Sequence, residues 1–132
     1  MTVQEIFDEV RQIDIYDNGS NIKLLPAQMG YKLVINSFKN LLEGGRQMPA
    51  FGVSLDNETR AAMREGLWVE FDFGKKLRYS EMSFEKLLVQ VVSSCSGFNI
   101  IRYNADEGYQ GRCYYFALDG NMSNFYDILK SV

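Results

Sequence analysis

Histidine is absent from this chain of 132 residues. Without an imidazole, the protein has no Ser-His-Asp or Cys-His catalytic set, no histidine ligand for zinc and no histidine as a general base at neutral pH. An enzyme of this sequence would depend on carboxylates, lysine, tyrosine or cysteine. The sequence therefore favours a protein without catalytic activity, although it leaves carboxylate chemistry open.

A basic surplus is also missing. The chain has 14 Lys and Arg residues against 17 Asp and Glu residues, which gives a net charge of −3. Nucleic-acid backbones attract proteins with the opposite balance, so nucleic-acid binding by the domain as a whole is disfavoured. Proline is scarce, with two residues, and hydrophobic residues make up 46% of the chain. This composition is typical of a folded chain rather than a disordered one.

Targeting, cofactor and redox motifs are the next absences. The first nine residues have no cationic start and no apolar run of the length of a signal peptide or membrane span, so we expect a cytoplasmic protein. Cys95 and Cys113 lack CxxC spacing and are expected to be small buried side chains; whether they lie close together stays open. No glycine-rich phosphate-binding motif is present, and no cofactor is expected.

The length predicts a single globular domain over residues 1–132. Its N-terminal part, about 1–45, is expected to be helical. A capping box at Thr2 and Glu5 predicts a helix ending near Ile13, residues 17–25 suggest a hairpin, and an apolar stripe predicts a helix from Tyr31 to a stop at residues 44–45.

The α+β part, about 46–132, is expected to contain strands, hairpins and helices in alternation. These elements are a strand at 51–55, a helix with Asp56 as its cap through Arg64, a hairpin at 67–79, a helix from Ser83 to about Gly97, a hairpin at 98–118 and a helix from Ser123. The order places two hairpin-helix (ββα) units in tandem. Met82-Ser83 and Met122-Ser123 stand at equivalent cap positions, which fits either an ancient duplication or the general frequency of serine caps.

These elements predict an α+β fold with an antiparallel sheet of about four to five strands and helices packed on one face. Counted from residue 51, the same order can also be drawn as a ferredoxin-like βαββαβ arrangement. Such folds carry many unrelated functions, so the architecture alone assigns none.

One tryptophan lies on an unexpected face of its strand. Residues 67–73 alternate strictly, and the alternation places Trp68 with Glu70 and Asp72 on the side expected to face water. A large ring needs cover there, either from a helix, for which the one beginning at Tyr31 is the candidate, or from a partner. Which face of the sheet is covered stays open.

Tyrosines and arginines gather around the last hairpin. They are Arg102, Tyr103, Tyr109, Arg112, Tyr114 and Tyr115, with the last two on opposite faces of one strand. Such residues form hot spots in protein interfaces, stack on bases in single-stranded nucleic acids, or pair across strands. Residues 108–116 lack the basic residue and spacing of an RNA-binding RNP1 segment, which makes nucleic acid a less favoured partner.

Carboxylates offer the one enzymatic alternative. Asp56, Glu70 and Asp72 are the candidates for a divalent-metal site acting on a phosphoester, with Lys75 or Lys76 beside it. The nuclease-type pattern D…E-x-K is not met, because aspartate follows Glu70 and Phe71 where lysine is required. These carboxylates also fit plainer roles as a helix cap and as the wet face of a strand.

The favoured hypothesis is a small acidic cytoplasmic domain, without catalytic activity, that acts by binding another protein. The candidate partner-binding residues are Trp68, Glu70, Asp72, Arg102, Tyr103, Tyr109, Arg112, Tyr114 and Tyr115. An inhibitor or immunity protein, with Asp106 and Glu107 as further contacts for a basic target, is a variant of this hypothesis. The metal-dependent enzyme and the single-strand binder are the alternatives. Partner identity and oligomeric state stay open.

Overall fold

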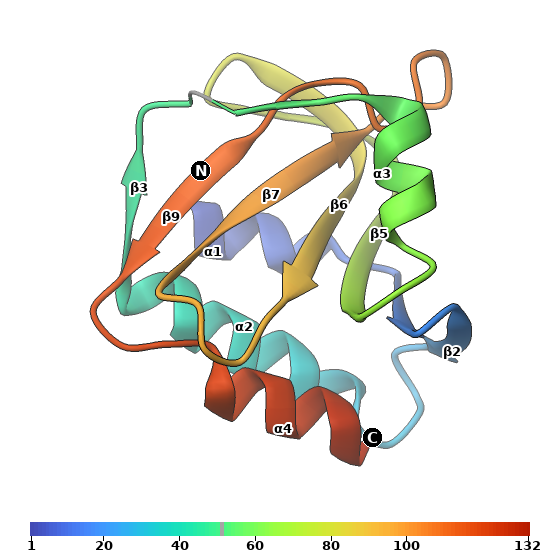
Figure 1. The fold of residues 1–132 in the computed structure, drawn as a ribbon, viewed down its shortest axis with the longest axis vertical. Coiled ribbons are helices and arrows are strands. Elements are labelled where there is room, and N and C mark those ends of the chain that lie inside the picture. Colours follow the sequence, from blue (N-terminus) through green and yellow to red (C-terminus); the bar gives the residue numbers. More distant parts are fainter. Residues whose placement is uncertain (51) are drawn as a thin grey trace.

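A seven-stranded antiparallel sheet forms the centre of the molecule (Figure 1). The computed structural model describes residues 1–50 and 52–132. The strands follow the order β2-β1-β5-β6-β7-β9-β3 across the sheet. Their bounds are β1 (Gln12–Asp17), β2 (Ser20–Leu24), β3 (Gly45–Met48), β5 (Leu67–Tyr79), β6 (Met82–Val91), β7 (Gly97–Tyr103) and β9 (Tyr114–Leu118). A separate two-stranded sheet pairs β4 (Val53–Ser54) with β8 (Gly111–Arg112).

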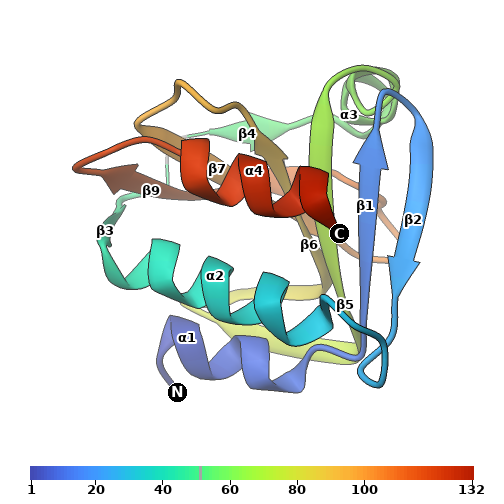
Figure 2. The same cartoon turned by 90° about the horizontal axis from the view of Figure 1, so that it is seen from below.

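Helices lie on both sides of the large sheet. Figure 2 shows α1, α2 and α4 in one layer in front of the sheet, with α3 behind it. The bounds are α1 (Val3–Ile6), continued by the 3₁₀ turn η1 (Phe7–Glu9), then α2 (Tyr31–Glu43), α3 (Asp56–Ala62) and α4 (Ser123–Ser131). The fold is therefore α+β, as predicted, but its sheet is wider than the four to five strands expected. No helix among the described residues has the length and apolar character needed to cross a membrane.

The main core lies between the sheet and the layer of α1, α2 and α4. Phe38 of α2 is completely buried, and its ring lies 5.0 Å from Phe7, 4.8 Å from Phe71 and 5.4 Å from Phe125, measured between centroids. Phe71 belongs to the alternating series predicted to face inward from residues 67–73. The apolar stripe of α2 and the alternation of β5 thus meet at one aromatic cluster.

The largest difference from the sequence prediction is at residues 82–91, which form strand β6 instead of a helix. β6 lies in the middle of the sheet and is covered on both faces, with Val89 in the main core and Leu88 in a second cluster. A strand buried on both faces shows a nearly continuous apolar run, and such a run also contains helical spacings. With no helix between β6 and β7, the described residues form neither tandem ββα units nor a ferredoxin-like order.

The hairpin at 67–79 was predicted with its turn at Gly74-Lys75-Lys76, but the turn between β5 and β6 lies later. β5 continues through residues 74–76, where the register shifts between Asp72 and Leu77, and the chain reverses at Ser80 and Glu81. Both residues have positive φ, 50° and 65°, as a two-residue type I′ hairpin turn requires. Gly74-Lys75-Lys76 is compatible with an irregularity in a strand as well as with a turn, and for this reason the turn was predicted at the wrong place.

The N-terminal third contains more strand than expected. The first helix has its predicted Thr2 cap but gives way to β1 at Gln12, and β1 pairs with β2 through the Asn18-Gly19 turn. The hairpin prediction for residues 17–25 is confirmed, whereas a helix reaching Ile13 is wrong. Residues 12–24 therefore belong to the large sheet, and residues 1–45 are not a separate helical part.

Several other elements agree with the prediction. The helix from Tyr31, the hairpin of β7 with β9 and the helix from Ser123 are confirmed. The helix after residue 55 is also present, but the structure assigns its N-cap to Leu55 and its first turn to Asp56. Phe51, part of the predicted strand at 51–55, lies outside the described residues. Both cysteines are free thiols, and Cys95 is exposed rather than buried.

Candidate functional site

The face of the sheet turned away from α1, α2 and α4 holds most of the predicted site residues, and we call it the outer face. Its side chains alternate with those of the main core along five strands. The members discussed below are Asp14, Tyr16, Trp68, Glu70, Asp72, Lys86, Leu88, Gln90, Asn99, Ile101, Tyr103 and Tyr115. Part of this face lies under a cover made of β4, α3 and the loop of residues 104–110.

Trp68 is buried by this cover, with 3% of its surface exposed, and packs with Leu88 and Tyr109. Its indole N–H donates a hydrogen bond of 2.8 Å to the carbonyl oxygen of Glu65, just after α3. The expectation that a helix covers Trp68 is therefore correct, but the helix is α3. The helix beginning at Tyr31 lies on the opposite face.

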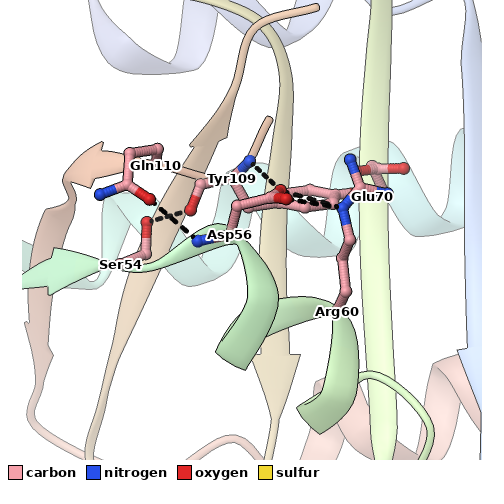
Figure 3. Close-up of polar contacts among 6 residues, drawn as sticks. All are labelled: Ser54, Asp56, Arg60, Glu70, Tyr109 and Gln110. Atoms are coloured by element: carbon pink, nitrogen blue, oxygen red, sulfur yellow. Dashed lines mark hydrogen bonds and ion pairs between the residues drawn. The ribbon is translucent and has the colours of Figure 1, made fainter. Parts of the chain in front are cut away.

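The cover is tied together by Asp56, as Figure 3 shows. The backbone N–H of Tyr109 donates to Asp56 Oδ1 at 2.8 Å, and Arg60 Nε lies 2.9 Å from the same oxygen. The Tyr109 N–H, followed by the Arg60 guanidinium, holds the pKa of Asp56 below its ordinary value. Ser54 Oγ donates a hydrogen bond of 2.8 Å to the carbonyl oxygen of Tyr109. The backbone of Tyr109 is thus bound both by Ser54 of β4 and by Asp56 of α3.

Tyr109 in turn connects the cover to the sheet. Its hydroxyl donates a hydrogen bond of 2.5 Å to Glu70 Oε2, and Tyr16 reaches Oε1 of the same carboxylate at 3.5 Å. The ammonium of Lys86 lies 4.0 Å from Oε1. The loss of hydration on burial, followed by the nearby Glu70 carboxylate, raises the pKa values of Tyr16 and Tyr109. Both hydroxyls therefore stay protonated and can act as hydrogen-bond donors.

Glu70 is only 1% exposed, which is unusual for a carboxylate in the middle of a sheet. Burial raises its pKa above the ordinary value, and the Tyr109 hydrogen bond and Lys86 only partly counter that effect. Asp14 stands directly opposite on β1 and is also buried. Gln12 donates to Asp14 Oδ2, while Oδ1 has no hydrogen-bond partner among the described residues. Two buried acids thus face each other across neighbouring strands.

The predicted metal ligands do not converge. Asp56 is bound to Arg60 and Tyr109, Glu70 to the two tyrosines, and Asp72 accepts the backbone N–H of Gly74. Across residues 1–50 and 52–132, no three acidic or cysteine side chains are placed to hold one metal ion. Lys75, suggested as the neighbouring cation, instead lies 3.7 Å from Glu9. Asp56, Glu70 and Asp72 thus have separate hydrogen-bond partners in the structure.

The other candidate residues divide between the two faces. Tyr114 belongs to the main core and donates to the carbonyl of Tyr79 at 2.7 Å, while Tyr115 lies on the outer face, so their predicted opposition is confirmed. Arg102 donates to the backbone carbonyls of Ser83 and Arg112. Arg102 and Tyr114 therefore make contacts within the protein. Trp68, Glu70 and Tyr109 are almost completely buried.

Beside the cover, the outer face is hollowed. Two adjoining hollows, of about 240 and 290 Å³, share Trp68, Asn99 and Ile101 in their lining. Together we call them the groove. Its further lining includes the exposed apolar side chains Val53, Leu55 and Val92.

Of the candidate residues, Trp68 and Tyr115 line the groove, whereas Arg102, Tyr103, Tyr109, Arg112 and Tyr114 do not. Sequence reasoning missed Asn99, Ile101 and the apolar rim. Val53 and Leu55 alternate with Ser54 and belong to the strand predicted at 51–55; in the structure both are more than 40% exposed. Comparisons with protein-family models, with curated proteins and with solved structures found no match for this chain.

Proposed function

We propose that the protein binds another protein, and that the groove receives an extended segment of that partner. The observation that carries this proposal is the position of three exposed apolar side chains around one concave floor. Val53 is 63% exposed, Leu55 45% and Val92 38%. Single exposed apolar residues are ordinary on protein surfaces, but a set that borders the same hollow is typical of a binding site.

The floor of the groove is rigid before any partner arrives. Trp68 is packed against Leu88 and Tyr109, and its indole N–H is already used by Glu65. A ring held in this way fixes the shape of the floor and loses no side-chain freedom on binding, while its 3% exposure leaves the contact area to the rim. The aromatic residue that sequence analysis singled out therefore acts as a fixed floor, and Val53, Leu55 and Val92 provide the accessible contacts.

The shape and charge of the groove indicate which kind of peptide segment it binds. In an extended chain every second side chain points to the same side, so two adjoining hollows accept two apolar side chains of one segment. Among the described residues that line the groove, Glu58 alone carries a charge. A lysine or arginine in the partner segment fits beside Glu58, and the net charge of −3 steers such a segment toward the protein.

Selection from a library of random peptides displayed on phage tests this proposal. We expect the protein to enrich peptides with apolar residues at alternate positions and a neighbouring Lys or Arg. Val53→Asp and Val92→Asp place a charge on the rim of the groove. Each should weaken the binding of the selected peptides about tenfold or more. Met29→Asp is the matched control, because Met29 is 96% exposed and lies outside the groove.

A charge reversal sharpens the same experiment. Glu58→Lys should change the preferred charged residue of the selected peptides from basic to acidic, with no loss of the apolar pattern. The proposal is wrong if no peptide is enriched, or if the selected peptides bind the two rim variants as tightly as they bind the Met29→Asp protein. Retained thermal stability of the variants shows that they are folded.

A further inference from the structure

Another hollow, separate from the two that form the groove, lies on the other side of the cover. It has a volume of about 310 Å³ and is lined by Tyr16, Gly19, Arg60, Met63, Arg64 and Tyr109. These residues come from β1, the β1–β2 turn, the region of α3 and the loop of residues 104–110. None of them lines the groove, and the volume is at the lower end of the range for small-molecule sites.

Part of the wall of this hollow is aromatic and apolar. Tyr16 and Tyr109 both turn their hydroxyls toward Glu70; Tyr109 is 5% exposed, so the partly exposed Tyr16 and Met63 supply the accessible apolar surface. The hydrogen bonds from the two hydroxyls to Glu70 fix the orientation of the rings. Rings fixed in this way, together with a polarizable sulfur, favour a planar ligand of about one aromatic ring.

The charge of the hollow is opposite to that of the protein. Among the described residues that line it, Arg60 and Arg64 alone are charged, in a chain whose net charge is −3. Arg60 is neutralised by Asp56, and its guanidinium carbon lies 5.2 Å from the centroid of the Tyr109 ring. Arg64 is exposed and has no ion pair with any other described residue. One cation is thus available for a ligand.

The number of negative charges on that ligand is limited by Glu70. Its carboxylate lies behind the two tyrosines, where it repels a second negative charge. We propose that this hollow binds a small planar molecule with a single negative charge, of the class of aromatic carboxylates. The carboxylate pairs with Arg64, and the ring lies against Tyr16 and Met63.

Titration with sodium benzoate tests this inference. Trp68 is the only tryptophan of the chain and the cross-strand neighbour of Tyr16, so its fluorescence reports on the hollow. We expect a saturable change with a Kd on the order of 1 mM, as fits a ligand of this size. Benzamide, which has the ring without the charge, and inorganic phosphate, which has charge without the ring, should each bind about tenfold more weakly.

Two arginine variants provide the matched comparison. Arg64→Ala should weaken benzoate binding about tenfold without changing the melting temperature of the free protein, whereas Arg78→Ala, at an exposed position of β5 outside the hollow, should bind benzoate as the parent does. The inference is overturned by equal binding to the two variants, by equal binding of phosphate and benzoate, or by no saturable signal. Because no residue is shared with the groove, these results are independent of peptide binding.

Discussion

The two faces of the sheet are buried by different means. On the helical side, α1, α2 and α4 cover an unbroken set of aromatic and aliphatic side chains around Phe38. On the outer face, a small cover encloses two carboxylates, two tyrosines and a tryptophan. The first face depends on apolar area and close packing, and the second depends on hydrogen bonds to buried carboxylates, of which Asp14 keeps one oxygen without a partner among the described residues.

The largest expected effect is on the helical side. Phe38→Ala removes a fully buried ring that contacts Phe7, Phe71, Phe98 and Phe125, and leaves a cavity that rigid neighbours cannot fill. We expect the free energy of unfolding to fall by about 3–5 kcal/mol, measured by urea denaturation. A loss of less than about 1.5 kcal/mol would mean that the core collapses easily and that the contrast between the faces is wrong.

A smaller effect is expected from the hydroxyl that joins the cover to the sheet. Tyr109→Phe keeps the ring but leaves Glu70 without its 2.5 Å donor in a buried position. The cost should be about 1–3 kcal/mol, more than that of Tyr31→Phe, which removes a hydroxyl bonded to the neutral carbonyl of Val10. If urea denaturation gave equal losses of unfolding free energy for the two variants, the Glu70 carboxylate would need its hydrogen-bond donor no more than a neutral carbonyl does.

The pH dependence of stability separates the faces further. Because the folded pKa of Glu70 is raised, its contribution is fully present below the unfolded value near 4.5 and is lost as pH rises through the folded pKa. Glu70→Gln keeps an acceptor for Tyr109 and removes the charge. At pH 7 it should be more stable than the parent by about 1 kcal/mol, and stability should decline less between pH 4 and 7. Parallel pH profiles of the two proteins would contradict this.

The smallest effect should come from an ion pair outside both buried faces. Lys75 and Glu9 lie 3.7 Å apart with side chains about half exposed. Lys75→Ala should change the free energy of unfolding by less than about 0.5 kcal/mol, because solvent screens such pairs. A larger loss would indicate that the register shift of β5 depends on this contact.

Local patterns predicted the elements whose apolar side chains repeat at one regular spacing. The apolar stripe of α2 and the series Leu67, Val69, Phe71 and Phe73 both face the main core, and carboxylates alternate with that series at residues 70 and 72 although β5 is buried on both faces there. β6 failed this test because both of its faces are covered, and its apolar run fits a helix and a strand equally. Position in the sheet, which depends on distant partners, decided between them.

The candidate site was predictable only in part. Trp68 was identified because a large ring on a polar face is a local contradiction that needs cover. The burial of Glu70 had no such signal, since it depends on Tyr109, a residue far along the chain in a polar loop. The exposure of Val53 and Leu55 had no signal either, because alternation shows which side chains share a face but not whether that face is covered.

The cover also has a place in the order of folding. Asp56 and Tyr109 are separated by 53 residues, and β5, β6 and β7 lie between them in the chain. Their contact closes a long loop and has a surface to rest on only after those strands have paired. We therefore expect Glu70 to stay hydrated while the sheet assembles and to lose its water only when Tyr109 docks, late in folding.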